Sequence, residues 1–309
     1  MKKIIAICLA ALSVAAWSRE VITVQLGAAA SQPNNATYLR TFDVANRQQD
    51  KYEFVAEVKP GANGALALRT MDLSPANRLA TIAPAFVENS KSGLINEADY
   101  VPVSSQGDAC WAVITNVGNT KLGLKSLHGQ QEIIVGGTGF GNATHITAII
   151  LSERYGFKIR YVVYKSNFDA LVAMAGNNGP NFVIERIQNY NTFRERNPAL
   201  QVLGINCPRR NPLMPEVRTV KEQGFETPSI FFFVVANVRM PETKRQEISA
   251  ILETAQRTVG SDYLLESADL FAPQFSNPTI SVADFFVRRT SYMHYLTTKY
   301  KSQIEDSKR

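Results

Sequence analysis

The sequence predicts an α/β protein with two lobes, each built on a mostly parallel sheet. Short apolar runs alternate with amphipathic segments along almost the whole chain, and this alternation is typical of parallel strands joined by crossover helices. Several of the runs end in loops rich in glycine or proline that lead directly into a helix. The chain has 309 residues, more than one hydrophobic core usually holds, so we expect two lobes rather than one.

The first residues are typical of an export signal. Lys2 and Lys3 precede an apolar run over residues 4–16, and Ala16 and Ser18 supply the small side chains that a signal peptidase reads. The run has about 13 residues, whereas a helix needs roughly 20 to span a bilayer. We therefore expect an exported protein that is cleaved near Ser18 rather than a protein with a membrane anchor.

Composition and charge restrict the partners. Of the residues, 45% are hydrophobic and 19% are charged, which is an ordinary balance for a soluble globular protein. The formal net charge of +6 is spread along the chain, and no long basic run is interleaved with aromatic residues. We expect no nucleic acid partner and no more than a mild preference for anionic solutes.

The histidines and cysteines give no sign of a metal site. His128, His145 and His294 are isolated and have no ligand spacing to one another or to a cysteine, so we expect no metal and no cofactor. Cys110 and Cys207 each lie at the edge of an apolar run, far apart in the sequence. They could pair in an oxidising compartment, but we expect two unpaired buried thiols.

The first part of the mature chain consists of repeated strand, loop and helix units. Strands are expected at residues 21–26, 51–58 and 79–82, and helices at residues 36–48 and from the loop after 58 to about Met71. The loops at 27–35, 59–64 and 83–85 follow the strands. Because ligands of parallel sheets bind beyond the carboxyl ends of the strands, these loops are candidate binding loops.

One stretch in the middle of the chain is the strongest candidate for a binding site. Residues 133–135 form a short apolar strand that runs into a loop with four glycines, and the loop ends at Asn142, a good N-cap for a helix reaching Tyr155. Glycine permits close approach of the backbone, and the first amides of a helix lack internal partners, so the loop suits a phosphate or a carboxylate. The alternative is a loop that only turns the chain.

Nucleotide motifs fit this stretch poorly. A P-loop needs Lys followed by Ser or Thr after its second glycine, whereas Asn142 and Ala143 follow Gly141. The dinucleotide spacing fails after Gly139, because the next glycine comes too early. A site for a small anion therefore remains.

The remaining segments continue the alternation of strands and helices. The apolar pattern continues through residues 101–103 to a strand at 110–115. Further strands are expected at 158–164, 182–184, 200–205 and 230–236, and helices from Asn167 and at residues 219–223, 241–259 and 281–305. We expect the strand at 110–115 to cross into the second lobe and the strand at 230–236 to return to the first. The expected parts are a signal peptide (1–18), a discontinuous first lobe (19–115 and 230–309) and a second lobe (116–229).

Four stretches resemble motifs of one protein family. Residues 57–64 look like its Asn-Arg-Pro-Gly-Ala-Gly-Gly turn, residues 163–165 like its Pro-Tyr-Lys-Gly strand end, and residues 139–145 like Gly-x-Gly-Ser-x-x-His. The most specific match is residues 209–224, similar to Arg-x-x-x-x-Pro-x-Val-Pro-Thr-Val-x-Glu-x-Gly. In this order they resemble the extracytoplasmic solute receptors of the tripartite tricarboxylate transporter family, also called Bug-type binding proteins.

The resemblance implies a periplasmic protein with a type II binding fold, a discontinuous first lobe and a ligand in the cleft between the lobes. It implies a small carboxylate as the ligand and, as partners, the membrane subunits of a tripartite tricarboxylate transporter or a sensor protein, because some receptors of this kind serve sensing instead of uptake. We expect a monomer. No nucleophile elbow, metal spacing or coherent triad is present, so we expect no enzymatic activity.

The loops and the resemblance together nominate the ligand-binding residues. They are Ala30, Ser31, Asn34, Pro84, Ala85, Thr138, Gly139, Gly141, Asn142 and Glu185. The loop from Gly139 to Asn142 would hold one carboxylate. Glu185 stands where the family often has Asp, and it could accept a hydrogen bond from a ligand hydroxyl or ammonium, or be a structurally paired or solvated carboxylate.

The first loop departs from the family pattern. The family has Pro-x-x-Pro-Gly-Gly-x-x-Asp there, whereas this chain has Gly27, three alanines, Ser31 and two asparagines. Pro84 and Ala85 likewise replace the usual Thr, Ser and Gly. We therefore expect a different ligand geometry on this side, and we expect Tyr164 and His145 to be structural.

Overall fold

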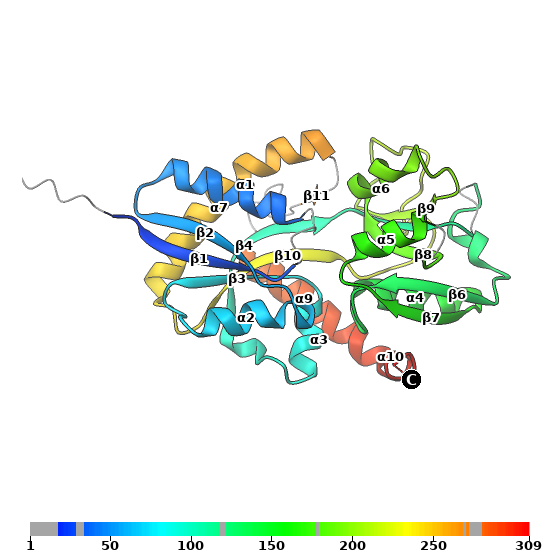
Figure 1. Cartoon of the computed structure of the whole chain (residues 1–309), viewed down its shortest axis with the longest axis horizontal. Helices are drawn as coiled ribbons and strands as arrows, with labels where there is room; N and C mark the ends of the chain where they lie inside the picture. The colour runs from blue at the N-terminus through cyan, green and yellow to red at the C-terminus, as the bar shows by residue number, and fades with distance from the viewer. Residues whose placement is uncertain are drawn as a thin grey trace, which may run out of the picture.

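The computed structural model describes residues 18–28, 34–117, 121–176, 179–267, 270–271 and 280–308. In these residues the chain forms two sheets, each covered by helices, which lie side by side as two lobes (Figure 1). The expected α/β class with two lobes is confirmed, and both sheets are mixed, with parallel pairs at their core. The expected signal peptide lies outside the described residues except for Ser18.

The sheet of the first lobe has six strands in the order β11-β4-β10-β3-β1-β2. The strands are β1 (Glu20–Leu26), β2 (Tyr52–Val58), β3 (Arg78–Ile82), β4 (Tyr100–Ala109), β10 (Ile230–Asn237) and β11 (Leu270–Phe271). β1 is parallel to both β2 and β3, as the repeated units predict, whereas β10 is antiparallel to β3 and β4. β10 therefore joins the sheet in the opposite direction when the chain returns from the second lobe.

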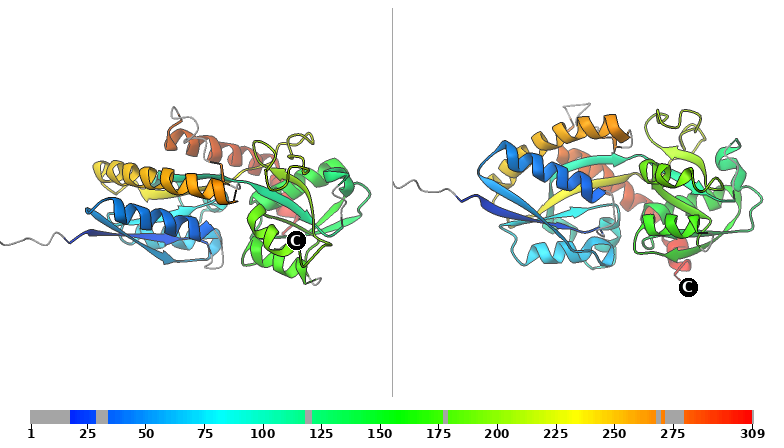
Figure 2. Two further views of the ribbon diagram at one scale, coloured as in Figure 1. Left: turned by 90° about the horizontal axis from the view of Figure 1, so that it is seen from above. Right: turned by 45° about the horizontal axis from the view of Figure 1, so that its top comes forward.

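Helices cover both faces of this sheet. α1 (Asn34–Gln48) and α7 (Glu242–Ser267) lie beside each other on one face (Figure 2), and α2 (Ala65–Asp72), α3 (Ala85–Lys91) and α9 (Val282–Lys299) lie on the other. The sequence of β10 is apolar without a break because both faces of this strand are buried. Phe231 and Phe233 pack into the α9 side while Phe232 and Val234 pack into the α1 side, since successive side chains of a strand point to opposite faces.

The sheet of the second lobe has five strands in the order β7-β6-β8-β5-β9. The strands are β5 (Trp111–Thr115), β6 (Glu132–Gly137), β7 (Lys158–Val163), β8 (Phe182–Arg186) and β9 (Gln201–Asn206). β6 is parallel to β7 and β8, and β5 is antiparallel to β8 and β9. α4 (Ala143–Tyr155) covers one face, and α5 (Asn167–Ala175) and α6 (Ile187–Arg194) cover the other.

The chain passes between the lobes in extended segments. Cys110 alone separates β4 of the first sheet from β5 of the second, so the whole of β5 lies in the second lobe. The C-terminal helices α9 and α10 (Lys301–Asp306) also reach across the boundary (Figure 1). Ile304 shares a hydrophobic cluster with Ile146 and Ile149 of α4, and Gln303 Nε2 donates a hydrogen bond of 2.9 Å to Glu153 Oε1.

The expectation of two unpaired cysteines is wrong. Cys110 and Cys207 form a disulfide with their Cα atoms 4.9 Å apart. Trp111 of β5 is the antiparallel partner of Asn206 of β9, so the two cysteines flanking this pair lie opposite each other. The sheet register brings them together across a sequence separation of 97 residues.

Other differences concern helices. α3 starts directly after Pro84, within the loop expected at 83–85, and α6 follows β8 without any loop. The short helix expected at 219–223 is instead a turn that ends at Gly224 with a φ of 85°, and Thr219 forms an isolated bridge to Ile205. The long C-terminal helix is interrupted at Tyr300, which separates α9 from α10.

Candidate functional site

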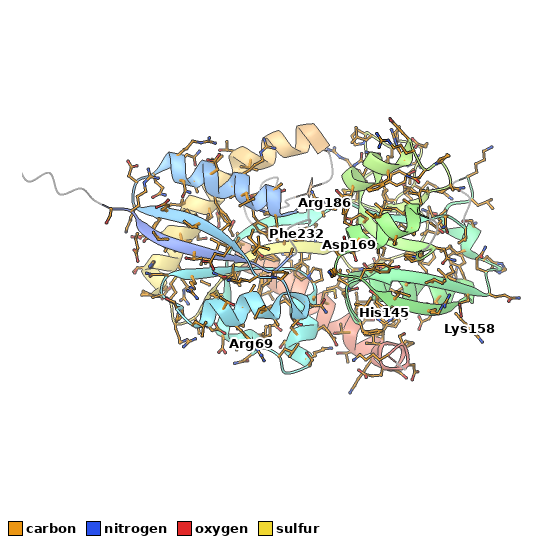
Figure 3. All side chains as sticks on the ribbon, in the orientation of Figure 1. Arg69, His145, Lys158, Asp169, Arg186 and Phe232 are labelled. Carbon is orange, nitrogen blue, oxygen red and sulfur yellow. A yellow bond between two sulfur atoms is a disulfide. The ribbon has the colours of Figure 1, made fainter. Side chains whose placement is uncertain are left out.

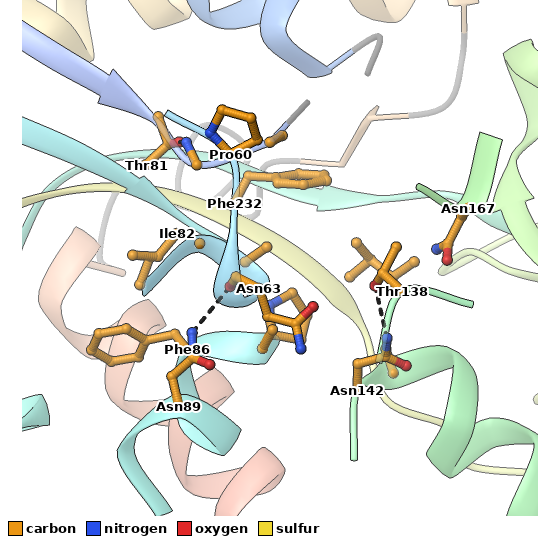
Figure 4. A pocket seen from close by; sticks show the side chains of 18 of the residues that line it. Pro60, Asn63, Thr81, Ile82, Phe86, Asn89, Thr138, Asn142, Asn167 and Phe232 are labelled. Carbon is orange, nitrogen blue, oxygen red and sulfur yellow. Dashed lines mark hydrogen bonds between the residues drawn. The ribbon is translucent and has the colours of Figure 1, made fainter. Parts of the chain in front are cut away.

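A cavity of about 220 Å³ lies between the two lobes, and we call it the interlobe cavity (Figure 4). Segments that follow β1, β2 and β3 line it from the first lobe, and segments that follow β6 and β7, together with the last two residues of β8, line it from the second. These are the carboxyl ends of the parallel strands, where ligands of α/β proteins bind. The cavity therefore occupies the place that the repeated units predict.

The N-terminus of α4 forms one wall of this cavity. Asn142 Oδ1 accepts a hydrogen bond of 3.0 Å from the His145 amide, which makes Asn142 the N-cap that the sequence predicts. Its Nδ2 donates to Thr138 Oγ1 at 2.9 Å (Figure 4). Ala143 and Thr144, the first residues of the helix, also line the cavity. Amides at these positions have no acceptor within the helix and lie at its positive end, so this wall suits an anion.

Gly139 and Gly141 lie between the lobes but are not among the residues that line the cavity. A Cβ on Gly139 would lie 2.4 Å from Asn63 Nδ2, and a Cβ on Gly141 would lie 2.8 Å from Glu88 Oε2. Gly141 has a φ of 72° and donates its N–H to His145 Nδ1 at 3.0 Å. These glycines let the second lobe approach the first lobe closely.

Charged side chains enter the cavity from the ends of β7 and β8. Glu185 and Arg186 are 4% and 5% exposed, and Glu185 Oε1 accepts the Arg186 backbone N–H at 2.7 Å. Both have further partners. Lys165, after β7, is exposed and also lines the cavity. Arg186 lies close to the boundary between the lobes (Figure 3). A guanidinium and an ammonium at this site favour an anionic ligand.

The sequence nominated Glu185 but missed Lys165 and Arg186. Lys165 follows β7 and Arg186 ends β8, and such positions are where parallel sheets bind ligands, but the sequence alone does not show which strand ends face the same cavity. Asn167 was missed as well. It is the first residue of α5, and its Nδ2 donates to Thr144 Oγ1 at 3.3 Å.

The wall from the first lobe is mainly apolar. Its apolar side chains include Pro60, Leu68, Ile82, Pro84, Ala85 and Phe232. Three polar residues of this wall have partners inside the first lobe. Thr81 Oγ1 accepts from the Gly27 amide at 3.0 Å, Tyr38 Oη donates to the Phe233 carbonyl at 3.3 Å, and Asn89 Nδ2 donates to the Asn63 carbonyl at 3.0 Å.

The ten nominated residues thus have different places. Pro84, Ala85, Thr138, Asn142 and Glu185 line the interlobe cavity, and the two glycines lie beside it. Asn34 begins α1, but its side chain is not described. Ala30 and Ser31 lie outside the described residues.

His145 is buried behind the cavity wall and is a structural residue, as its place in the first turn of α4 suggests. Its ring is 4.4 Å from that of Tyr161 and 5.6 Å from that of Phe140, measured between centroids. Burial lowers the pKa of His145 to about 4, and the charge of Lys308 contributes in the same direction. The imidazole is therefore neutral near pH 7, and the Gly141 amide donates to its Nδ1.

The described part of the chain contains no group of three or more His, Cys, Asp or Glu residues that could hold a metal ion. None of its helices has the length and apolar character needed to cross a bilayer.

Solved structures share this architecture, although no protein-family model and no curated protein sequence matches the chain. A TctC solute binding protein from Polaromonas, solved without ligand, has a TM-score of 0.63 at 16% identity over 90% of this chain and 98% of its own. MatC from Rhodopseudomonas palustris with bound malate has a TM-score of 0.71 at 15% identity over 92% and 98%. An R. palustris protein with adipate has 0.69 at 17% over 90% and 98%. The chain therefore has the two-lobed, type II periplasmic-binding fold of these solute-binding proteins.

Proposed function

We propose that the protein is a periplasmic solute-binding protein that captures a small carboxylate in the interlobe cavity. The observation that carries this proposal is the N-terminus of α4, capped by Asn142, on the wall of a cavity between two lobes. Lys165 and Arg186 add positive charge to the same lobe. The fold shared with proteins that hold malate and adipate supports the same conclusion.

In this proposal the carboxylate accepts hydrogen bonds from the amides of Ala143 and Thr144, with Thr138 and Asn142 beside it. A helix N-terminus contributes roughly 0.3 to 2 kcal/mol to anion binding, whereas micromolar affinity needs about 8 kcal/mol. The helix is therefore insufficient alone. Charge pairing with Lys165 or Arg186 and contact with the first lobe supply the remainder, and closure of the lobes excludes water from the ion pair.

For the closing lobes we propose a division of the chain that differs from the expected one at the first crossing. We place that boundary at Cys110, because β5 belongs entirely to the second sheet, and the return at Ile230, where β10 begins. Hinge closure about these two extended segments is the motion we propose. The captured solute is then delivered to the membrane subunits of a tripartite tricarboxylate-type transporter, with the receptor acting as a monomer and without catalysis.

Ligand-induced stabilisation tests this function. The purified mature chain, refolded to remove any solute carried from the cells, is heated with mono-, di- and tricarboxylates and with amines of matched size as controls. A ligand at one hundred times its Kd stabilises the folded state by about 2.7 kcal/mol, which raises Tm measurably. We expect at least one carboxylate, and none of the amines, to raise Tm. No stabilisation by any carboxylate at millimolar concentration would contradict the proposal.

The role in uptake needs a separate measurement. Deletion of the protein in its own cells should abolish uptake of the labelled carboxylate identified by the thermal screen. If uptake is unchanged and only a transcriptional response to the solute is lost, the protein is a sensing receptor instead.

A further inference from the structure

The charges around the interlobe cavity are confined to one lobe. Lys165, Glu185 and Arg186 all belong to the second lobe. The described residues of the first lobe that line the cavity include no ionisable group except the Tyr38 hydroxyl. The connection from β1 to α1, residues 27–33, also has no ionisable side chain in its sequence. Two cations and one carboxylate leave a net charge of +1, which balances one carboxylate on the ligand.

Several backbone amides of the first lobe close to the cavity have acceptors within that lobe. After β3, the Phe86 amide donates to the Ala83 carbonyl at 2.9 Å and the Val87 amide donates to the Pro84 carbonyl at 3.3 Å. Pro84 itself has no N–H to offer. The Gly27 amide donates to Thr81 Oγ1. The Asn63 side chain, a polar group of this wall, lies against Gly139 of the second lobe.

A second carboxylate would therefore meet a poor environment. One end of a dicarboxylate could lie at the α4 N-terminus, but its other end would face Ile82, Pro84 and Phe232. Burial of a carboxylate away from any cation is strongly unfavourable. A hydrocarbon group in the same position would gain from the removal of its surface from water.

We propose that the ligand is a monocarboxylate with a hydrocarbon body. Its carboxylate lies against the second lobe, at the amides of Ala143 and Thr144 and near Lys165 and Arg186. Its hydrocarbon lies against the apolar wall formed by Leu68, Ile82, Pro84, Ala85 and Phe232. This assignment rests on the proposed function and specifies its ligand class. The small cavity, below the roughly 300 Å³ typical of small-molecule sites, limits the ligand to a short-chain or single-ring acid.

Hexanoate and adipate form a matched pair for the test, because both have six carbons and only adipate has a carboxylate at the far end. Isothermal titration of the refolded mature chain at neutral pH should give a Kd for hexanoate at least tenfold lower than that for adipate. A Kd for adipate equal to or lower than that for hexanoate overturns the inference and leaves the proposed function intact. Failure of every carboxylate to bind overturns both.

A variant on the first lobe locates the hydrocarbon. Ala85→Ser adds a hydroxyl to the apolar wall at the first residue of α3. We expect it to lower the ratio of the Kd for adipate to the Kd for hexanoate by at least threefold. Ala250→Ser, a matched change at an exposed position of α7 outside the cavity, should keep the wild-type ratio. If Ala85→Ser binds both acids as the wild type does, the hydrocarbon does not lie against this wall.

Discussion

Asn142 caps α4 and lines the interlobe cavity with the same side chain. Asn142→Leu removes the cap and places a hydrocarbon beside the amides of Ala143 and Thr144. We expect carboxylate affinity to fall at least tenfold in isothermal titration. The anion loses the polar Asn142 side chain and is placed next to the hydrocarbon of leucine. The free energy of unfolding should fall by only about 1 kcal/mol, which is typical for a lost N-cap.

A second N-cap provides the control for this experiment. Ser281 caps α9 by accepting the Asp284 amide at 3.0 Å, and it does not line the cavity. Ser281→Ala should therefore lower stability by a similar amount while leaving affinity unchanged. Equal affinity of Asn142→Leu and the wild type would remove the α4 N-terminus from the binding site.

His145 makes the stability of the fold depend on pH. Its pKa is lowered by burial to about 4, so between pH 6.5 and pH 4 the unfolded chain binds a proton that the folded chain does not. The contribution to stability is complete above pH 6.5 and is lost as the pH falls to 4. We expect urea unfolding to show a loss of roughly 3 kcal/mol from this group across that range.

Matched histidine variants separate this contribution from those of other groups. His145→Gln should flatten the pH dependence of the unfolding free energy between pH 6.5 and pH 4. His128→Gln, at an exposed position, should keep the wild-type dependence. If His145→Gln retains the full slope, the loss of stability arises elsewhere.

Among the elements, the sequence predicted those whose pattern is local. The apolar runs at residues 51–58 and 158–164 form β2 and β7, and Asn142, at the end of its loop, is the N-cap of α4. α3 and α6 were missed because each begins directly at a strand end or a proline, without a polar loop to separate the patterns. Lys165 and Arg186 were missed as site residues because only the arrangement of the two sheets shows which strand ends face the same cavity.

The disulfide depends on the pairing of two elements rather than on local sequence. Cys110 and Cys207 meet only when β5 and β9 are in register, and they close a segment with a separation of 97 residues. Cys110→Ser/Cys207→Ser should lower the free energy of unfolding by about 2–5 kcal/mol in urea, because the unfolded chain regains conformational freedom. The wild type should lose a similar amount in reductant, and the variant should not respond to it. Detection of two free thiols in the denatured, unreduced wild type would instead show that the two cysteines are unpaired.

At the scale of the whole molecule, binding depends on how closely the lobes approach. Gly139 of the second lobe packs against the Asn63 side chain of the first, and Gly141 lies against Glu88. Gly139→Val adds a branched side chain at this contact and should hold the lobes apart. We expect carboxylate affinity to fall at least fivefold, since an open cleft leaves the ion pair in water.

Small-angle scattering distinguishes this effect from local damage to the site. Saturating carboxylate should decrease the radius of gyration of the wild type, whereas Gly139→Val at saturation should keep the larger radius of its free state. Gly176→Ala is the matched control, because Gly176 has an ordinary φ of −80° and a Cβ there would make contacts of 3.6 Å or more. That variant should close as the wild type does. If Gly139→Val binds and closes normally, Asn63 yields to the new side chain, and the two glycines do not control closure.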